Sequence, residues 1–215
     1  MNTGEMKIKD YLEELSGKAP VPGGGGVCGL AGALSASLGQ MVCSLTMGKK
    51  KFASIEGEVS AAFARLQESR VRLLELADRD AEVFLPLSGA YSMPADTESE
   101  KEAKQTVMEA CLKAAASVPC DIMNTVCHML EDVAYIAVNG SRLAVSDAAN
   151  AAALSRAVIA SCLTNIRINT KLMHDRDHAE ATEKAARALY ADGIKECDRI
   201  YDIVMSGLWG ETWNC

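Results

Sequence analysis

The sequence contains few aromatic residues, because Phe, Trp and Tyr together make up only 5% of its 215 residues. Sheet-rich domains draw heavily on aromatic and β-branched side chains, and no segment of this chain alternates polar and apolar residues as a half-buried strand does. Apolar residues instead recur three and four positions apart, as on one face of a helix. The sequence therefore predicts an all-α protein, a single domain over 1–215 built as an antiparallel bundle of long helices.

The chain also has fewer positively charged than negatively charged residues. The chain has 22 Lys and Arg against 29 Asp and Glu, a formal net charge of −7. A general nucleic-acid-binding protein must neutralise many phosphates, so no nucleic-acid partner is expected. The stretch 19–48 lacks charged residues altogether, but Gly, Ala and Ser dominate it. We expect a helix buried on all sides within protein, partly by a second copy of the chain, rather than a membrane-spanning segment.

Motifs typical of metal sites are missing as well. Eight cysteines are present, yet none forms a CxxC pair. A zinc site would need paired thiolates at short spacing, so we expect free, mostly buried thiols in a reducing cytoplasm and no metal. His174 and His178 stand four residues apart, but at a predicted helix boundary, where capping Asp residues and exposed His residues are common.

Apolar spacing and the positions of Gly and Pro predict six helices. The expected ranges are 5–15, 27–47, 52–90, 99–137, 148–172 and 177–205. Pro86 and Pro119 should kink or end their helices, and Gly48 should follow the end of the second one. Ser146 or Asp147 should cap the fifth helix. The apolar face of the first helix is expected to contain Met6, Ile8, Leu12 and Leu15.

A glycine run, 23–26, lies between Pro22 and the second predicted helix. Glycines allow positive φ, so this segment is expected to be a loop that presents successive amide donors beside a helix N-terminus and favours an anionic or carbonyl group. The alternative is a flexible connector or a place of close helix packing. No strand precedes the run, which excludes a P-loop or a dinucleotide-binding motif, and no nucleotide is expected.

Three further groups of polar residues stand out. Lys49, Lys50 and Lys51 follow the uncharged helix; they either offset its dipole and are solvated, or they bind an acidic ligand. Asn165 and Asn169 share one face of a largely apolar helix, so they either lock neighbouring helices together or line a pocket. Asp80 shares a face with apolar residues, and burial there would raise its pKa and suit it to proton transfer.

The motifs, taken in order along the chain, resemble those of a known family. They are PVPGGGGVCGLAGAL at 20–34, LTMGKKKF at 45–52, DAEVF at 80–84, Val118-Pro119, Asn139, Ser146-Asp147 and NIRIN at 165–169. The chain is similar to the cyclodeaminase/cyclohydrolase family, which includes the cyclodeaminase domain of formiminotransferase-cyclodeaminase and stand-alone methenyltetrahydrofolate cyclohydrolases.

The resemblance implies an all-helical homodimer that binds a tetrahydrofolate derivative as its substrate, without a metal or nucleotide. The first reaction that it implies converts 5-formimidoyltetrahydrofolate to 5,10-methenyltetrahydrofolate and ammonia. The alternative is methenyltetrahydrofolate cyclohydrolase, from 5,10-methenyl to 10-formyl, and a second alternative is a non-catalytic folate-binding helical dimer. A formiminotransferase is a candidate partner.

The resemblance also suggests a role for each candidate residue. Asp80 would transfer protons, and Asn165 and Asn169 would orient the pterin or a water molecule. The lysine run Lys49, Lys50 and Lys51 would pair with the carboxylates of a folate, including a polyglutamylated one. The substrate-binding set comprises Gly24, Gly25, Gly26, Lys49, Lys50, Lys51 and Asp147.

The sequence departs from the family pattern at three positions. Gly26 stands where the family usually has Ser, so a hydroxyl group is missing from the glycine run. Ala95 stands where Lys is common, and Lys104 stands where Arg is expected. Each departure bears on how the folate tail is held or on which substrate is chosen.

Overall fold

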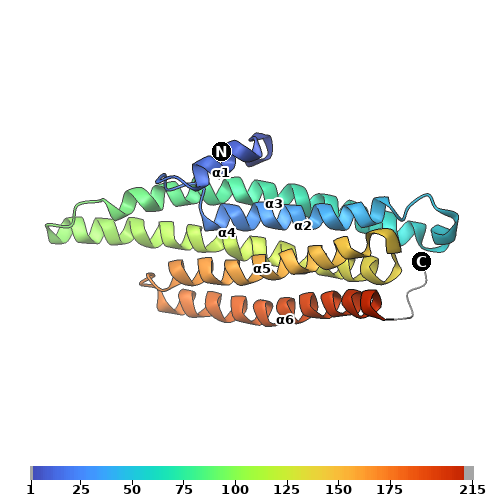
Figure 1. Cartoon of the computed structure of the whole chain (residues 1–215). Helices are drawn as coiled ribbons and strands as arrows, with labels where there is room; N and C mark the ends of the chain where they lie inside the picture. The colour runs from blue at the N-terminus through green and yellow to red at the C-terminus, as the bar shows by residue number, and fades with distance from the viewer. Residues whose placement is uncertain (1, 211–215) are drawn as a thin grey trace.

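The structure, a computed structural model, describes residues 2–210, and all regular secondary structure in that range is helical. Neighbouring long helices along the chain run in opposite directions, and a short helix lies outside the bundle (Figure 1). This arrangement confirms the predicted all-α bundle. The α-helices are α1 (Ile8–Leu15), α2 (Gly24–Ser44), α3 (Glu56–Tyr91), α4 (Glu98–Asn139), α5 (Val145–Thr170) and α6 (Arg176–Trp209).

The two longest helices pass through the prolines that were expected to end or kink them. Pro86 lies inside α3 and Pro119 inside α4, and neither helix ends there. Burial of Pro119 in the core offsets the loss of one backbone hydrogen bond. A capping box starts α4: the Thr97 side chain accepts from the Glu100 amide at 3.2 Å, and Glu100 accepts from the Thr97 amide at 2.8 Å.

The segment 8–15 is helical as predicted, but its apolar face turns only partly towards the bundle. Ile8 is 80% exposed and Leu12 is 55% exposed, whereas Tyr11 is only 4% exposed. The preceding segment is tied to α3, because the amide and hydroxyl of Thr3 donate to the Asp78 carboxylate at 2.8 and 2.6 Å. This attachment sets which side of α1 faces the bundle, a tertiary effect that periodicity alone does not contain.

The uncharged helix α2 begins and ends three residues earlier than the sequence predicts, and Gly48 beyond its end has φ of +73°. It is not buried on all sides, since Leu34 is 54% and Met41 50% exposed. By length and composition α2 and the segment Arg142–Thr170 could each cross a membrane. Both pack within the bundle, as core helices of this composition also do.

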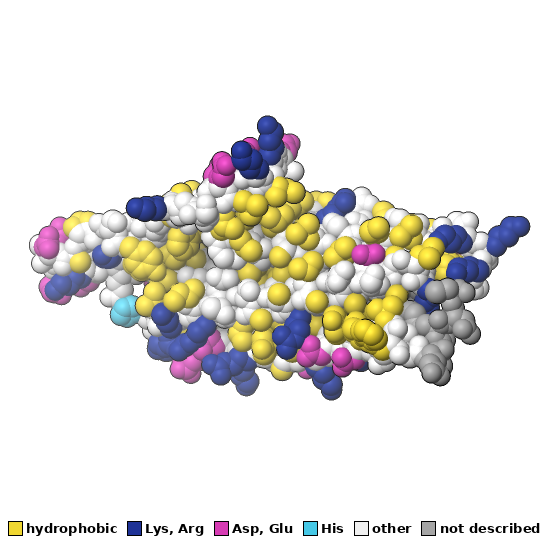
Figure 2. Space-filling view, viewed as in Figure 1, with side chains coloured by type: hydrophobic (Ala, Val, Ile, Leu, Met, Phe, Trp, Pro, Cys, Tyr) yellow, Lys and Arg dark blue, Asp and Glu magenta, His cyan; other side chains and the backbone are white. Residues whose placement is uncertain are grey.

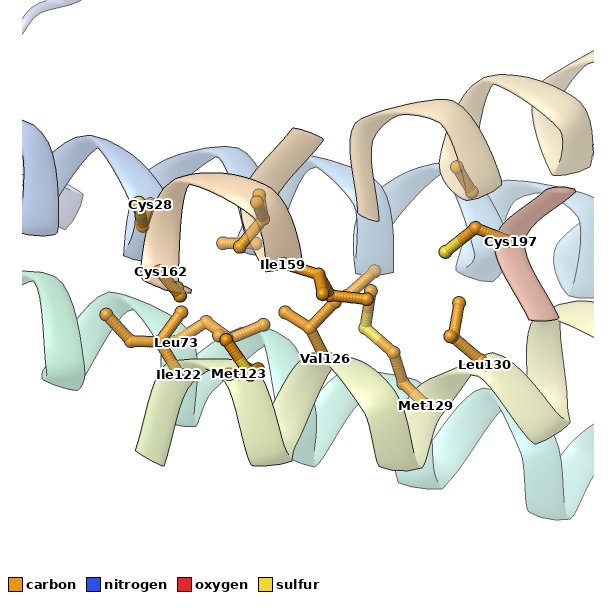
Figure 3. Packing of buried hydrophobic residues seen from close by; sticks show 14 of the residues in the cluster. Cys28, Leu73, Ile122, Met123, Val126, Met129, Leu130, Ile159, Cys162 and Cys197 are labelled. Atoms are coloured by element: carbon orange, nitrogen blue, oxygen red, sulfur yellow. The ribbon is translucent and has the colours of Figure 1, made fainter. Parts of the chain in front are cut away.

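Close packing joins α2 to its neighbours. A Cβ atom on Gly29 would lie 2.7 Å from the Leu73 carbonyl oxygen, so only glycine permits this approach of α2 to α3. The Ser35 hydroxyl donates to the Ala151 carbonyl of α5 at 2.7 Å. Figure 3 shows the core side chains that fill the space between these helices and α4. The N-terminus of α2 is thereby fixed against both α3 and α5.

Candidate functional site

The glycine run forms the first turn of α2 and not the predicted loop. Gly24–Gly26 are helical and Gly23 is the N-cap, and positive φ occurs among residues 2–210 only at Gly48. The reason for glycine is space: a Cβ atom on Gly25 would lie 2.0 Å from Oδ1 of Asp80. The close-packing alternative therefore explains the run, and what packs against it is a carboxylate.

Asp80 lies half-buried on α3, directly against the N-terminus of α2. Burial raises the pKa of its carboxyl group, and a hydrogen bond from the Gly26 amide acts in the opposite direction. The N-terminal end of a helix also favours a negative charge. The carboxylate is thus held in place by a helix end while its proton affinity is increased, which suits a group that accepts and returns a proton.

Asn165 on α5 meets the same turn of α2 from the other side. A Cβ atom on Gly24 would lie 3.3 Å from Oδ1 of Asn165. The Asn165 amide donates to the Ser161 carbonyl at 3.0 Å and to the Cys28 sulfur at 3.6 Å. Asp80 and Asn165 therefore lie against adjacent glycines, and the structure brings together two of the three predicted catalytic side chains.

Asn169 has a different environment. Its side chain is 9% exposed, and its amide donates to the carbonyl oxygens of Ala115 at 3.3 Å and Asn165 at 3.0 Å. The bond to Ala115 joins α5 to α4, and the bond to Asn165 lies within α5. The packing supports the helix-locking alternative for Asn169, and its role in orienting the pterin or water stays a prediction.

Two cysteines that carry no sequence motif lie behind Asn165. Cys28 and Cys162 are buried and face each other from α2 and α5 (Figure 3). A hydrogen bond from the Cys162 thiol lowers the pKa of Cys28, against the effect of burial. The same contact raises the pKa of Cys162. Spacing could not reveal this pair, because it forms only when α2 and α5 pack together.

Tyr11 is another group near the site that the sequence did not single out. Its hydroxyl lies 3.6 Å from the position that a Cβ atom on Gly26 would occupy, and Oδ2 of Asp80 lies 3.9 Å from that same position. The absence of a side chain at Gly26 therefore leaves an open position beside the Tyr11 hydroxyl and the Asp80 carboxylate. The departure at Lys104 has a structural explanation, since its ammonium donates to the Tyr91 and Met93 carbonyls at 2.9 Å.

The lysine run lies at the other end of α2. A helix of this length spans about 30 Å, so Lys49, Lys50 and Lys51 do not meet Asp80 within one chain. Lys49 approaches the Ser141 hydroxyl at 3.5 Å, and the Lys51 ammonium lies 4.9 Å from the centre of the Phe52 ring. Substrate binding by the lysines stays a prediction.

Asp147 also lies towards the lysine end of the bundle and is not the predicted N-cap. A short 3₁₀ helix, Arg142–Ala144, leads into α5, so the helix begins earlier and Ala144 is its N-cap. Asp147 falls in the first turn, where a carboxylate interacts favourably with the helix dipole. Its assignment to substrate binding stays a prediction.

No group of three or more His, Cys, Asp or Glu side chains within residues 2–210 is arranged to hold a metal ion. Asp175 caps α6, and its carboxylate accepts from the His178 amide at 3.0 Å, as the helix-boundary interpretation predicts. The described cysteines are free thiols, at positions 28, 43, 111, 120, 127, 162 and 197.

A largely uncharged surface runs along α2 and α5 past the site. Figure 2 shows a face on which hydrophobic and uncharged side chains cross the middle while Lys, Arg, Asp and Glu gather mainly at the margins. Large apolar residues on these two helices are strongly exposed, with Leu34 at 54% and Ile168 at 49%. We call this surface the α2/α5 face; its residues include Val27, Leu34, Leu38 and Met41 on α2 and Leu154, Ala157, Ser161, Asn165 and Ile168 on α5.

Comparison with known proteins adds three findings. The family model described as formiminotransferase-cyclodeaminase matches residues 7–188. A methenyltetrahydrofolate cyclohydrolase of Methylorubrum extorquens is 35% identical over 204 residues, which cover 94% of this chain and 98% of that protein. The crystal structure of a formiminotetrahydrofolate cyclodeaminase from Thermotoga maritima superposes with a TM-score of 0.80 at 28% identity, covering 98% of this chain and 99% of the other.

Longer relatives match over part of their length. The formimidoyltransferase-cyclodeaminase of Gallus gallus is 26% identical over 83% of this chain, and that of Rattus norvegicus is 25% identical over 86%. The chain spans about a third of each of these proteins, 33% and 34%.

Proposed function

Since the chain belongs to the formiminotransferase-cyclodeaminase family, whose named relatives are folate one-carbon enzymes, we propose that the protein is a methenyltetrahydrofolate cyclohydrolase. The observation that carries the proposal is the Asp80 carboxyl group, held against the first turn of α2 beside Asn165, with a pKa raised by burial. The Methylorubrum relative, which matches nearly the whole of both chains, favours this reaction over cyclodeamination.

The reaction needs a water molecule to be activated and a proton to be returned. In the proposed mechanism, the water oxygen bonds to the methenyl carbon while Asp80 accepts a proton from that water. The Asn165 side chain orients the water. The adduct then loses its hydroxyl proton as the C=O bond forms and the bond from carbon to N5 breaks. The bonding electron pair goes to N5, which takes up a proton. The net result is 10-formyltetrahydrofolate and one released proton.

Cyclodeamination is the second candidate, favoured by the similarity to the Thermotoga cyclodeaminase over nearly the whole chain. N10 would attack the formimidoyl carbon, Asp80 would remove the N10 proton, and the carbon–nitrogen bond to the departing ammonia would break after protonation of that nitrogen. The same carboxyl group serves both reactions, because each moves one proton at the same one-carbon unit. A separate formiminotransferase would be the partner that supplies this substrate.

Absorbance spectroscopy separates the candidates, because methenyltetrahydrofolate absorbs in the near ultraviolet. Loss of the methenyl band faster than its spontaneous rate is expected for the cyclohydrolase. Appearance of the band together with ammonia, from 5-formimidoyltetrahydrofolate, is expected for the cyclodeaminase. If the purified protein accelerates neither reaction but binds folate polyglutamates in a calorimetric titration, the non-catalytic folate-binding alternative replaces both.

We propose further that the protein is a homodimer joined through the α2/α5 face. An exposed apolar surface of this kind marks an interaction site, and a two-fold dimer buries the same surface on both copies. Asn165 belongs to that face, so the reaction site would lie at its edge. An antiparallel pairing would bring one copy's lysine run towards the other copy's Asp80, where it can reach the carboxylates of a bound folate.

A cytoplasmic location is part of the same proposal. The described cysteines are all free thiols, which suits a reducing compartment. Fractionation of the source cells with an antibody against the protein tests this location, and recovery in a membrane pellet would contradict it.

A further inference from the structure

Tyr11 carries a buried hydroxyl group that has no hydrogen-bond partner. The residue is 4% exposed, and among residues 2–210 its Oη is one of two buried side-chain polar atoms without a partner. A buried hydroxyl left unpaired costs about 1–3 kcal/mol, and such groups are uncommon in folded proteins. Phenylalanine would fill the same space without that cost, so the hydroxyl calls for an explanation other than packing.

The hydroxyl points towards the reaction site. The position that a Cβ atom on Gly26 would occupy lies 3.6 Å from Tyr11 Oη and 3.9 Å from Oδ2 of Asp80. Apart from Gly26 itself and the adjoining backbone of α2, the nearest atoms to that position are Tyr11 Oη and the Ala77 carbonyl oxygen, both at 3.6 Å. Tyr11 and Asp80 therefore border the same small space from α1 and α3. That space is open because Gly26 has no side chain.

The electrostatic environment keeps the phenol protonated. Burial raises the pKa of Tyr11, and the negative charge of Asp80 raises it further. Tyr11 is therefore a hydrogen-bond donor, and Asp80 is an acceptor when ionised. The other titratable groups facing this space are Asp78 on α3, which already accepts two bonds from Thr3, and Cys28 on α2, which contacts Cys162 on α5.

We propose that Tyr11 is a positioning residue for Asp80: its hydroxyl donates, through one water molecule beside Gly26, to the Asp80 carboxylate. This bond stabilises the ionised carboxylate that accepts a proton during the reaction, and it fixes the carboxylate's orientation. The inference rests on the proposed function and extends the site to the N-terminal helix.

The test is a rescue experiment on the full chain. Tyr11→Phe is expected to lower kcat about tenfold with KM nearly unchanged, and to shift the acidic limb of the pH–rate profile to higher pH, because Asp80 loses a donor to its ionised form. Apart from the adjoining backbone of α2, a Cβ atom on Gly26 would meet no atom closer than 3.6 Å, so Gly26→Ser fits into this variant and brings a hydroxyl near Oδ2 of Asp80. The double variant should restore both kcat and the profile. Tyr190→Phe is the matched control and should change neither.

The result that overturns the proposal is a Tyr11→Phe variant with an unchanged pH profile, or one whose lost activity Gly26→Ser does not restore. A readout independent of turnover is the NMR titration of the ¹³C-labelled Asp80 carboxyl, assigned by its disappearance in Asp80→Asn. The pKa of Asp80 should be higher in Tyr11→Phe than in the unchanged protein. If neither folate reaction is accelerated, the proposed function fails, and this titration still decides whether Tyr11 acts on Asp80.

Discussion

Oδ1 of Asp80 lies 2.0 Å from the point where a Cβ atom on Gly25 would stand. The carboxylate and the first turn of α2 are in such close contact that no side chain fits between them. The glycine run thus shapes the proposed reaction site through its missing side chains, since it lets α3 place a carboxylate against a helix N-terminus.

Gly25→Ala should therefore abolish most of the activity. The added methyl group must displace the Asp80 carboxylate, and a shift of about 1 Å at a reacting group can cost about 100-fold in rate. The matched control is Gly57→Ala in the first turn of α3, where an added Cβ meets nothing within 4 Å. Equal kcat values for the two variants would contradict the hypothesis that the glycine run keeps Asp80 in position for the reaction.

Asp80→Asn tests proton transfer directly. Turnover should fall at least about 100-fold, because the amide cannot accept the proton while the shape of the side chain is kept. Glu82→Gln removes an exposed carboxylate from the same helix and should leave turnover unchanged. A folded Asp80→Asn protein with full activity would require another base.

The raised pKa of Asp80 gives a pH dependence whose direction is fixed. Its folded pKa lies above the usual value of 3.8, so ionisation at neutral pH costs stability, and the cost disappears once the pH falls below 3.8. Asp80→Asn should accordingly melt at a higher temperature than the unchanged protein at pH 7, with the gap closing as the pH approaches 4. Calorimetry across this range is the measurement, and a lower melting temperature at pH 7 would contradict burial as the dominant effect.

Substitutions at Asn165 and Asn169 should have different effects, the first mainly on activity and the second mainly on stability. Asn169→Ala breaks the buried bond to Ala115 and should cost about 1–2 kcal/mol in urea unfolding. Asn165→Ala removes a half-exposed amide at the site and should reduce kcat about tenfold or more with a smaller loss of stability. If the two variants show the same ratio of lost activity to lost stability, the different roles assigned to them are wrong.

A charge on the α2/α5 face should prevent dimer formation. Leu34→Glu places a carboxylate on a side chain that is 54% exposed in one chain and would be buried between two. Light scattering should give twice the chain mass of 22.9 kDa for the unchanged protein and a single chain for the variant. Val71→Glu, at a residue of α3 that is 47% exposed, is the control and should stay dimeric. A monomeric unchanged protein would end the dimer proposal.

The sequence predicts each long helix because apolar spacing persists over many turns, and it singles out Asp80 because a carboxylate stands out among apolar neighbours. It does not predict the meeting of Asp80 with Asn165, which depends on α3 and α5 both packing on α2. The burial of Tyr11 likewise depends on the attachment of Thr3 to Asp78. The predicted substrate-binding set groups the lysine run with the glycine run, but the two lie at opposite ends of α2 because a helix of this length spans about 30 Å.

The glycines of α2 also determine how this chain can change over generations. A methyl group on Gly29 would press on the Leu73 carbonyl, and one on Gly25 would press on Asp80. The first substitution would damage a helix contact and the second would displace the proposed reacting group. Invariance along α2 would thus mark close backbone contacts as well as the proposed site, which borders only the first turn of the helix.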